Sequence, residues 1–104
     1  MARITNRQIE SHVASMLPFQ ANSAIGEAFP KWVSMGRLPS EYHASAGDSP
    51  VYVVFSYATP IAWVAVDGSV TVPAVKYSVT TSRTQNAVRA AFGMDRDQEH
   101  KPAE

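Results

Sequence analysis

The order of apolar and polar residues predicts an amphipathic helix near the N-terminus. Ile9, Val13, Met16 and Leu17 recur at helical spacing and form a single apolar stripe. Pro18 follows directly, and because the residue before a proline disfavours the helical conformation, we expect the helix to end there. The stripe would pack this helix against the rest of the protein.

A second pattern, rich in β-branched and aromatic residues, predicts a sheet in the C-terminal half. Four runs are expected to be strands: Val51–Tyr57, Ile61–Val66, Val70–Val72 and Val75–Thr80. The first is apolar on both faces, which is typical of a central, covered strand. Thr59-Pro60 and Asp67-Gly68 are turn sequences, and the second is a strong hairpin signal. These short connections predict an antiparallel meander.

Two capping boxes and one glycine mark the expected helix ends. Thr5 with Gln8, and Ser82 with Gln85, can each satisfy free backbone N–H groups at a helix start. Gly93 stands where a glycine commonly ends a helix. We therefore expect a C-terminal helix between Ser82 and Gly93. Its apolar residues would face inward, and three polar ones would line the opposite face: Arg83, Asn86 and Arg89.

The remaining segments carry weaker patterns. Residues 19–50 hold scattered apolar residues broken by Pro and Gly, so we expect short strands or turns on the main sheet and a surface loop over 43–50. Residues 94–104 are polar without apolar periodicity, which predicts a disordered tail. The expected fold is α+β, a single domain over 1–93 with an antiparallel sheet of three to five strands packed with an N-terminal and a C-terminal helix.

Composition narrows the classes of function. The 104 residues include no cysteine, which excludes disulfides, thiolate zinc sites and cysteine nucleophiles. No apolar run reaches the roughly 18 residues of a membrane-spanning helix, and the charged residues near the start argue against a signal peptide. Residues 1–93 carry a net charge of +2 and the tail −2, which is weak support for nucleic-acid binding.

No catalytic or metal-binding pattern stands out. The sequence contains no Gly-x-Ser-x-Gly elbow, no His-Glu-x-x-His pair and no glycine-rich phosphate loop. His12, His43 and His100 fall in a helix, a loop and the tail, without metal-ligand spacing. We therefore expect a protein that is not an enzyme and holds neither a metal nor a cofactor.

The junction before the C-terminal helix is the strongest candidate for binding. It combines hydroxyls, the free N–H groups of a helix start and a basic residue placed where it is unfavourable for the helix dipole. A bound phosphate or carboxylate would relieve that conflict. The candidate binding residues are Thr80, Thr81, Ser82, Arg83, Gln85 and Arg89. In the alternative interpretation Ser82 only caps the helix, the threonines belong to a strand and Arg83 points to solvent.

Aromatic residues of the sheet allow another interpretation. The residues concerned are Tyr52, Tyr57, Trp63 and Tyr77. Exposed on a sheet, such rings can stack nucleic-acid bases. Otherwise they pack in the core or at its rim, as is expected for a small domain without a basic-aromatic motif.

The segments YVVFSYATPIAW (52–63) and VPAVKYSVTTSRTQNAVR (72–89) resemble a domain of unknown function found in small proteins of actinobacterial phages, plasmids and related mobile elements. The matching residues are Ser56, Tyr57, Thr59, Pro60, Ile61, Tyr77, Ser78, Thr80, Thr81, Ser82, Arg83 and Gln85, with a looser match at Gly36, Leu38, Pro39 and Tyr42. Thr84 stands where that family usually has histidine, which puts any role of the histidine in doubt here. The resemblance implies a phage-like origin and a place in the host cytoplasm, but no activity.

Two functional hypotheses follow. Small size, near-neutral charge and the lack of a catalytic pattern favour a non-enzymatic, phage-type accessory protein that binds a host protein. The alternative is a nucleic-acid-binding module that uses the 80–89 junction, with Arg83 and Arg89 as its cations. Steep weakening of binding by salt would distinguish the second from the first.

Overall fold

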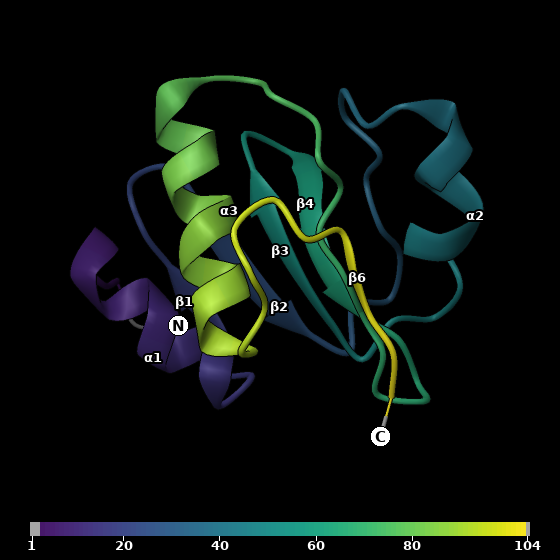
Figure 1. Ribbon diagram of the computed structural model, residues 1–104, viewed down its shortest axis with the longest axis horizontal. Helices are drawn as coiled ribbons and strands as arrows, with labels where there is room; N and C mark the ends of the chain where they lie inside the picture. Colours follow the sequence, from purple (N-terminus) through teal and green to yellow (C-terminus); the bar gives the residue numbers. More distant parts are fainter. Residues whose placement is uncertain (1–2, 104) are drawn as a thin grey trace.

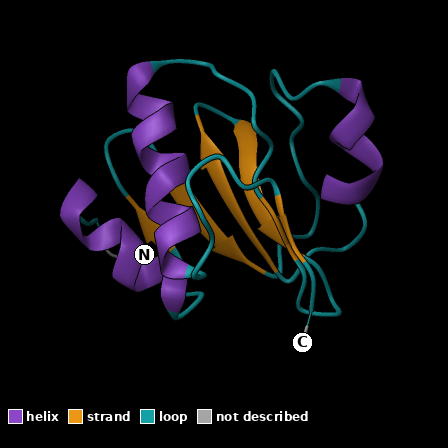
Figure 2. Cartoon of the chain, viewed as in Figure 1, coloured by secondary structure: helices purple, strands orange, loops and turns teal. Residues whose placement is uncertain are grey.

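The computed structural model describes residues 3–103 and shows an α+β fold built on one antiparallel sheet (Figures 1 and 2). The strands lie in the order in which they occur along the chain, so the predicted meander is confirmed. They are β1 (Phe19–Gln20), β2 (Ile25–Ala28), β3 (Tyr52–Ser56), β4 (Thr59–Val64), β5 (Val70–Thr71) and β6 (His100–Lys101). The sheet has six strands, whereas three to five were predicted, because the short β1, β2 and β6 lack a strong strand pattern.

Helices and loops cover both faces of the sheet (Figure 1). On one face lie α1 (Ile9–Ala14), which follows the 3₁₀ turn η1 (Asn6–Gln8), and α3 (Val79–Ala91). The segment between β2 and β3 covers part of the other face and contains the 3₁₀ turn η2 (Ser40–Tyr42) and α2 (His43–Ala46). The loop predicted over 43–50 therefore begins as a short helix.

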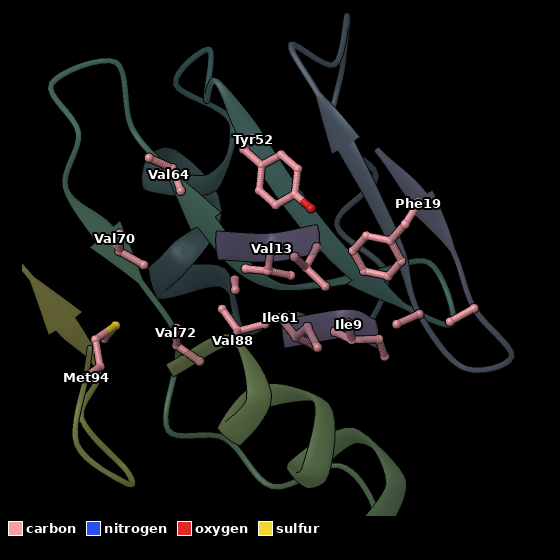
Figure 3. Packing of buried hydrophobic residues seen from close by; sticks show 14 of the residues in the cluster. Ile9, Val13, Phe19, Tyr52, Ile61, Val64, Val70, Val72, Val88 and Met94 are labelled. Carbon is pink, nitrogen blue, oxygen red and sulfur yellow. The ribbon is translucent and has the colours of Figure 1, made fainter. Parts of the chain in front are cut away.

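The helix-side core lies between the sheet and the two larger helices, where Figure 3 shows its side chains. Ile9 and Val13 of α1 and Val88 of α3 are fully buried against the sheet. The predicted N-terminal stripe is correct for Ile9 and Val13 but wrong for Met16 and Leu17, which are partly exposed. The reason is that α1 ends at Ala14 and Met16 adopts a positive φ of 50°, so the last turn of the stripe never forms.

The loop-side core lies on the other face of the sheet, and its members are Leu38, Ala46, Val53, Phe55 and Trp63. The indole Nε1 of Trp63 donates to Ser45 Oγ at 2.9 Å, which holds α2 against the sheet. Because β3 is buried on both faces, its prediction as a central strand is confirmed. Tyr52 and Trp63 are buried, so they cannot stack bases; Tyr77 is half-buried and Tyr57 is exposed.

The β3–β4 hairpin turns at Tyr57-Ala58, not at Thr59-Pro60 as predicted. Tyr57 and Ala58 both have positive φ, of 50° and 66°, which two-residue hairpin turns of this hand require. Pro60 is instead a buried strand residue beside a register shift between Val54 and Phe55. A proline is tolerated there because a bulge interrupts the hydrogen-bond ladder.

The structure agrees with the predictions for one further hairpin turn and for two helix ends. At Asp67-Gly68 the chain reverses between β4 and β5, with the Ser69 N–H donating to Asp67 Oδ1 at 2.9 Å. Gly93 follows α3 with a φ of 70°, as its prediction as a helix-ending glycine requires. At the N-terminus, Gln8 Oε1 accepts the Thr5 N–H at 3.0 Å, which is one half of the predicted capping box.

Gly26 permits close packing inside the helix-side core. A Cβ at this position would lie 2.3 Å from the Phe19 ring and 2.5 Å from the Tyr52 hydroxyl. The Tyr52 hydroxyl donates to the carbonyl oxygen of Leu17 at 2.8 Å, and burial raises the pKa of this phenol. The glycine thus lets β1, β2 and β3 share one tightly packed corner.

The structure differs from the predicted disordered tail over residues 94–103; residue 104, the last of the predicted tail, lies outside the described residues. Met94 is buried in the helix-side core, and β6 pairs with β5. Lys101 Nζ donates to the carbonyl oxygen of Phe92 at 2.6 Å, which ties β6 to the end of α3. Beyond Met94, polar and backbone contacts hold this segment, and its lack of apolar periodicity gave no sign of them.

Candidate functional site

The predicted binding residues lie on α3, which begins earlier than the sequence suggested. Ser78 is its N-cap, with Oγ accepting the Thr81 N–H at 3.1 Å. Thr80 and Thr81 therefore belong to the first helical turn, and Ser82 does not cap the helix. The predicted strand Val75–Thr80 is wrong because β-branched residues surround a serine that serves better as a cap.

Thr81 and Gln85 are buried and bond to the protein itself. Thr81 Oγ1 lies 3.0 Å from Ser56 Oγ, which links α3 to the β3–β4 hairpin. Gln85 Nε2 donates to the carbonyl oxygens of Pro73 and Val75, at 3.1 and 3.3 Å. Gln85 thus fixes the chain that leads into α3, and the predicted Ser82–Gln85 capping box does not form.

Arg89 is also internal, contrary to the prediction that it lies on the outer face. It is 4% exposed, and its guanidinium donates to the carbonyl oxygens of Gln98 (2.7 Å) and Val72 (3.1 Å) and to Asn86 Oδ1 (3.1 Å). Burial lowers the pKa of Arg89 from its usual value, although arginine remains charged in proteins. Arg89 therefore joins α3 to the residue that follows β5 and to the C-terminal segment.

The other three predicted residues remain accessible. Thr80 and Arg83 are exposed and Ser82 is half-buried. Ser82 and Arg83 line a groove of about 620 Å³ between α3 and the segment 74–78, which Arg96 and Asp97 border. We call this the α3 groove. The predicted site therefore falls into two parts. Its buried residues stabilise the fold, and its accessible residues could contact a ligand.

A smaller pocket lies where the two segments of the family resemblance meet. It measures about 220 Å³ and is lined by Arg37, Ser56, Tyr57, Thr59, Tyr77, Ser78 and Thr81. The Arg37 guanidinium lies 5.9 Å from the centroid of the Tyr77 ring, and the backbone N–H of Arg37 donates to Thr59 Oγ1 at 2.9 Å. Burial raises the pKa of Tyr77, whose hydroxyl has no hydrogen-bond partner among the described residues. Most other hydroxyls here bond one another, so this pocket mainly fastens the hairpin to the start of α3.

The three histidines are not brought together. His12 Nδ1 and His43 Nε2 each lie next to a backbone carbonyl oxygen, at 2.9 and 2.7 Å, and His100 is in β6. Within residues 3–103, no group of three or more His, Asp or Glu side chains is placed to hold a metal ion. None of the helices in this part of the chain is long and apolar enough to cross a membrane.

An exposed aromatic surface lies beside β2, and the sequence patterns did not indicate it. Phe29 and Trp32 are each 76% exposed, and Ile25 of β2 is also accessible. Ile25 and Trp32 border a hollow of about 440 Å³, whose full lining is Ile25, Glu27, Lys31, Trp32, Ser34, Phe55 and Ala58. Ile25, Phe29, Trp32 and this hollow are called the aromatic surface below. Phe55, which lines the hollow, also belongs to the loop-side core.

Phe29 combines an exposed side chain with a strained backbone. Its φ is 48°, in the left-handed region that bulky residues rarely adopt. The Phe29 N–H donates to the carbonyl oxygen of Val51 at 2.9 Å, which keeps the chain in this position. The fold therefore uses the backbone of Phe29 and leaves its ring in solvent. The one sign in the sequence was that Phe29 and Trp32 fit no helix or strand period.

Comparison with known proteins identifies the family of this chain. The sequence model of the Family of unknown function (DUF8033) matches residues 10–102, so the chain belongs to this family. No curated protein and no solved structure matches it. The family assignment agrees with an uncharacterised domain, as the resemblance of segments 52–63 and 72–89 implied.

Proposed function

We propose that this member of the DUF8033 family is a small non-enzymatic protein that acts by binding another protein through its aromatic surface. The observation that carries this proposal is the exposure of two large aromatic side chains, Phe29 and Trp32, the second of which lines an apolar hollow. Large aromatic side chains contribute most of the binding energy at many protein interfaces, where they dock into or beside such pockets. Neither ring is needed to fill a core of this protein.

The lining of the hollow suggests the chemistry of the partner. Ile25, Trp32 and Phe55 form an apolar pocket that suits one large apolar side chain. Glu27 and Lys31 at its edge carry opposite charges, which can orient a partner without strong preference for either sign. A protein surface with a protruding apolar residue, framed by polar groups, fits this arrangement.

We further propose that the protein is a phage-type accessory factor whose partner is a protein of the host cytoplasm. The support is the resemblance of segments 52–63 and 72–89 to proteins of actinobacterial phages and mobile elements. A small protein of this kind needs only a binding surface to redirect a host component, and the aromatic surface is available for that purpose.

Nucleic-acid binding through residues 80–89 is the second candidate. One observation favours it, because Lys76, Arg83 and Arg96 all line the α3 groove. It ranks second because Arg89, one of its two proposed cations, is committed to internal hydrogen bonds. Thr81 and Gln85 are likewise buried, so only part of the predicted surface could reach a nucleic acid.

A capture experiment tests the proposed function. The wild-type protein is immobilised and exposed to a nuclease-treated actinobacterial lysate, beside Trp32→Ala and the control Val66→Ala. Val66 is 72% exposed in the β4–β5 connection, outside the aromatic surface. We expect one partner to be retained by wild type and Val66→Ala, and about tenfold more weakly by Trp32→Ala. Equal retention by all three, or loss of all binding after nuclease treatment, would contradict the proposal.

A further inference from the structure

We infer that the α3 groove binds an extended acidic segment of a protein partner. This inference goes beyond the aromatic surface, because α3 and the hollow lie on opposite faces of the sheet. It therefore concerns a separate site, and it holds whether or not the aromatic surface is occupied. The grounds are the charge of the groove, its length and walls, and the backbone of the segment that borders it.

The charge of the groove is strongly one-sided. Three exposed cationic side chains line it, those of Lys76, Arg83 and Arg96, and Asp97 is the one carboxylate among the lining residues. The guanidinium of Arg89 is buried beneath them, where the carboxylates of Asp97 and Glu99 act on its charge, so the excess rests on the three exposed cations. The first turn of α3 contains no acidic residue, so its positive dipole end is not offset there either. Carboxylates of a ligand would neutralise this excess charge.

The length of the groove suits an extended chain. A second hollow of about 400 Å³ continues it along α3, sharing Asn86, Arg89 and Arg96 and ending at Ala90 and Met94. From Ser78 to Ala90 the helix axis spans about 18 Å, at a rise of ~1.5 Å per residue. A fully extended peptide covers that distance with about six residues.

The walls favour a peptide over a nucleic-acid strand. The uncharged part of the lining includes the aliphatic side chains of Val75 and Val79, which suit small apolar side chains. Single-stranded nucleic acids are instead held by rings on which bases stack. Tyr77 is the aromatic residue of the lining, and the Arg37 guanidinium already lies over its ring.

The segment that borders the groove also has backbone groups to offer. Residues 75–77 belong to no strand, and within residues 3–103 their N–H groups donate to no protein acceptor. The carbonyl oxygen of Val75, by contrast, is fixed by Gln85, which keeps this segment in place beside α3. An extended peptide can pair with such a stretch as an added strand, with its alternate side chains in the groove.

A labelled peptide of about six alternating glutamate and valine residues tests this inference by fluorescence anisotropy. We expect Lys76→Ala, Arg83→Ala and Arg96→Ala each to weaken binding about two- to five-fold, and the triple variant more than about tenfold. Added salt should weaken binding to wild type as well. Arg7→Ala removes the same charge from an exposed residue of η1 and should have no effect.

Three results would overturn the inference. The first is peptide binding that the triple variant retains in full. The second is an equal loss in Arg7→Ala, which would indicate an effect of net charge alone. The third is a single-stranded oligonucleotide of equal charge that displaces the peptide, which would make the groove a nucleic-acid site. Trp32→Ala serves as the remaining control and should bind the peptide normally, so that failure here and failure of the proposed function remain distinguishable.

Discussion

On one face of the sheet, α1 and α3 close over a continuous apolar core, whereas on the other face the segment 29–50 covers β3 and β4 but leaves β2 accessible. Ile9, Val13 and Val88 on the first face are fully buried and explained by folding. Phe29 and Trp32 beside the second face are largely exposed and contribute little to any core. The difference separates side chains that the fold needs from side chains that are available to a partner.

The same contrast appears on a smaller scale within α3. Arg83 and Arg89 have the same chemistry and stand less than two helical turns apart. Arg83 is exposed in the α3 groove, whereas Arg89 is buried and bonds to Val72, which follows β5, and to the C-terminal segment. Residue type alone therefore does not distinguish an accessible arginine from a structural one; the face of the helix on which it lies does.

The largest expected effect is the difference in folding stability between the alanine variants of these two arginines. Arg89→Ala should lower the free energy of unfolding by about 2–4 kcal/mol, because it leaves the buried carbonyl oxygens of Val72 and Gln98 without their donor. Arg83→Ala should change it by less than about 0.5 kcal/mol. Urea unfolding measures both. Similar values for the two variants would remove the distinction between inner and outer residues.

The next effect concerns the corner of the helix-side core at Gly26. Gly26→Ala places a Cβ against Phe19 and Tyr52, and relief of that contact should cost about 1–3 kcal/mol of folding free energy. Thermal unfolding followed by circular dichroism measures the loss. An unchanged melting temperature would mean that this corner has room for a Cβ and that β1 and β2 are not tightly packed there.

A smaller, pH-dependent effect is expected at Glu99, which links the two sides of the molecule. Its carboxylate accepts the Tyr42 hydroxyl at 2.5 Å and the Ala74 N–H at 3.0 Å. These bonds lower the pKa of Glu99, and the Tyr42–Glu99 bond raises the pKa of Tyr42 to about 12. Because the folded pKa of Glu99 is depressed, its contribution to stability is present above the unfolded value of about 4.3 and is lost as the pH falls through the folded value.

Glu99→Gln provides the matched comparison for this effect. Wild type should lose stability on acidification below about pH 5, and the variant should lose less over the same range. Urea midpoints measured from neutral pH down to about pH 3 test this. Parallel curves for the two proteins would show that Glu99 does not hold the C-terminal segment in the way the geometry indicates.

The sequence predicted the parts of the fold that local chemistry determines. The Asp67-Gly68 turn, the C-terminal glycine of α3 and the central strand β3 follow from residues adjacent in the chain. Pro60 and Ser78 were misassigned because each residue type suits two places: a proline fits a turn or a bulge, and a serine fits a strand end or a helix cap. Pro60 is placed by the pairing of β4 with β3, whereas Ser78 is placed by its own bond to the Thr81 N–H.

The candidate sites were less predictable than the fold. Of the residues proposed at the 80–89 junction, Arg83 was placed correctly at an accessible surface, whereas Gln85 and Arg89 were not. Their backbone partners lie in the segment 72–75 between β5 and α3 and at Gln98 beyond Gly93, and no local pattern indicates such contacts. The aromatic surface was missed because Phe29 and Trp32 follow no period, and their exposure depends on how the segment 29–50 crosses the sheet.

The most direct test of the central claim is the pair of values measured for Phe29→Gly, its folding stability and its affinity for the captured partner. Glycine relieves the positive φ and removes an exposed ring, so the free energy of unfolding should stay the same or rise by up to about 1 kcal/mol. Affinity for the partner should fall severalfold. A variant that is less stable, or that binds the partner as well as wild type, would contradict a surface kept for binding rather than for folding.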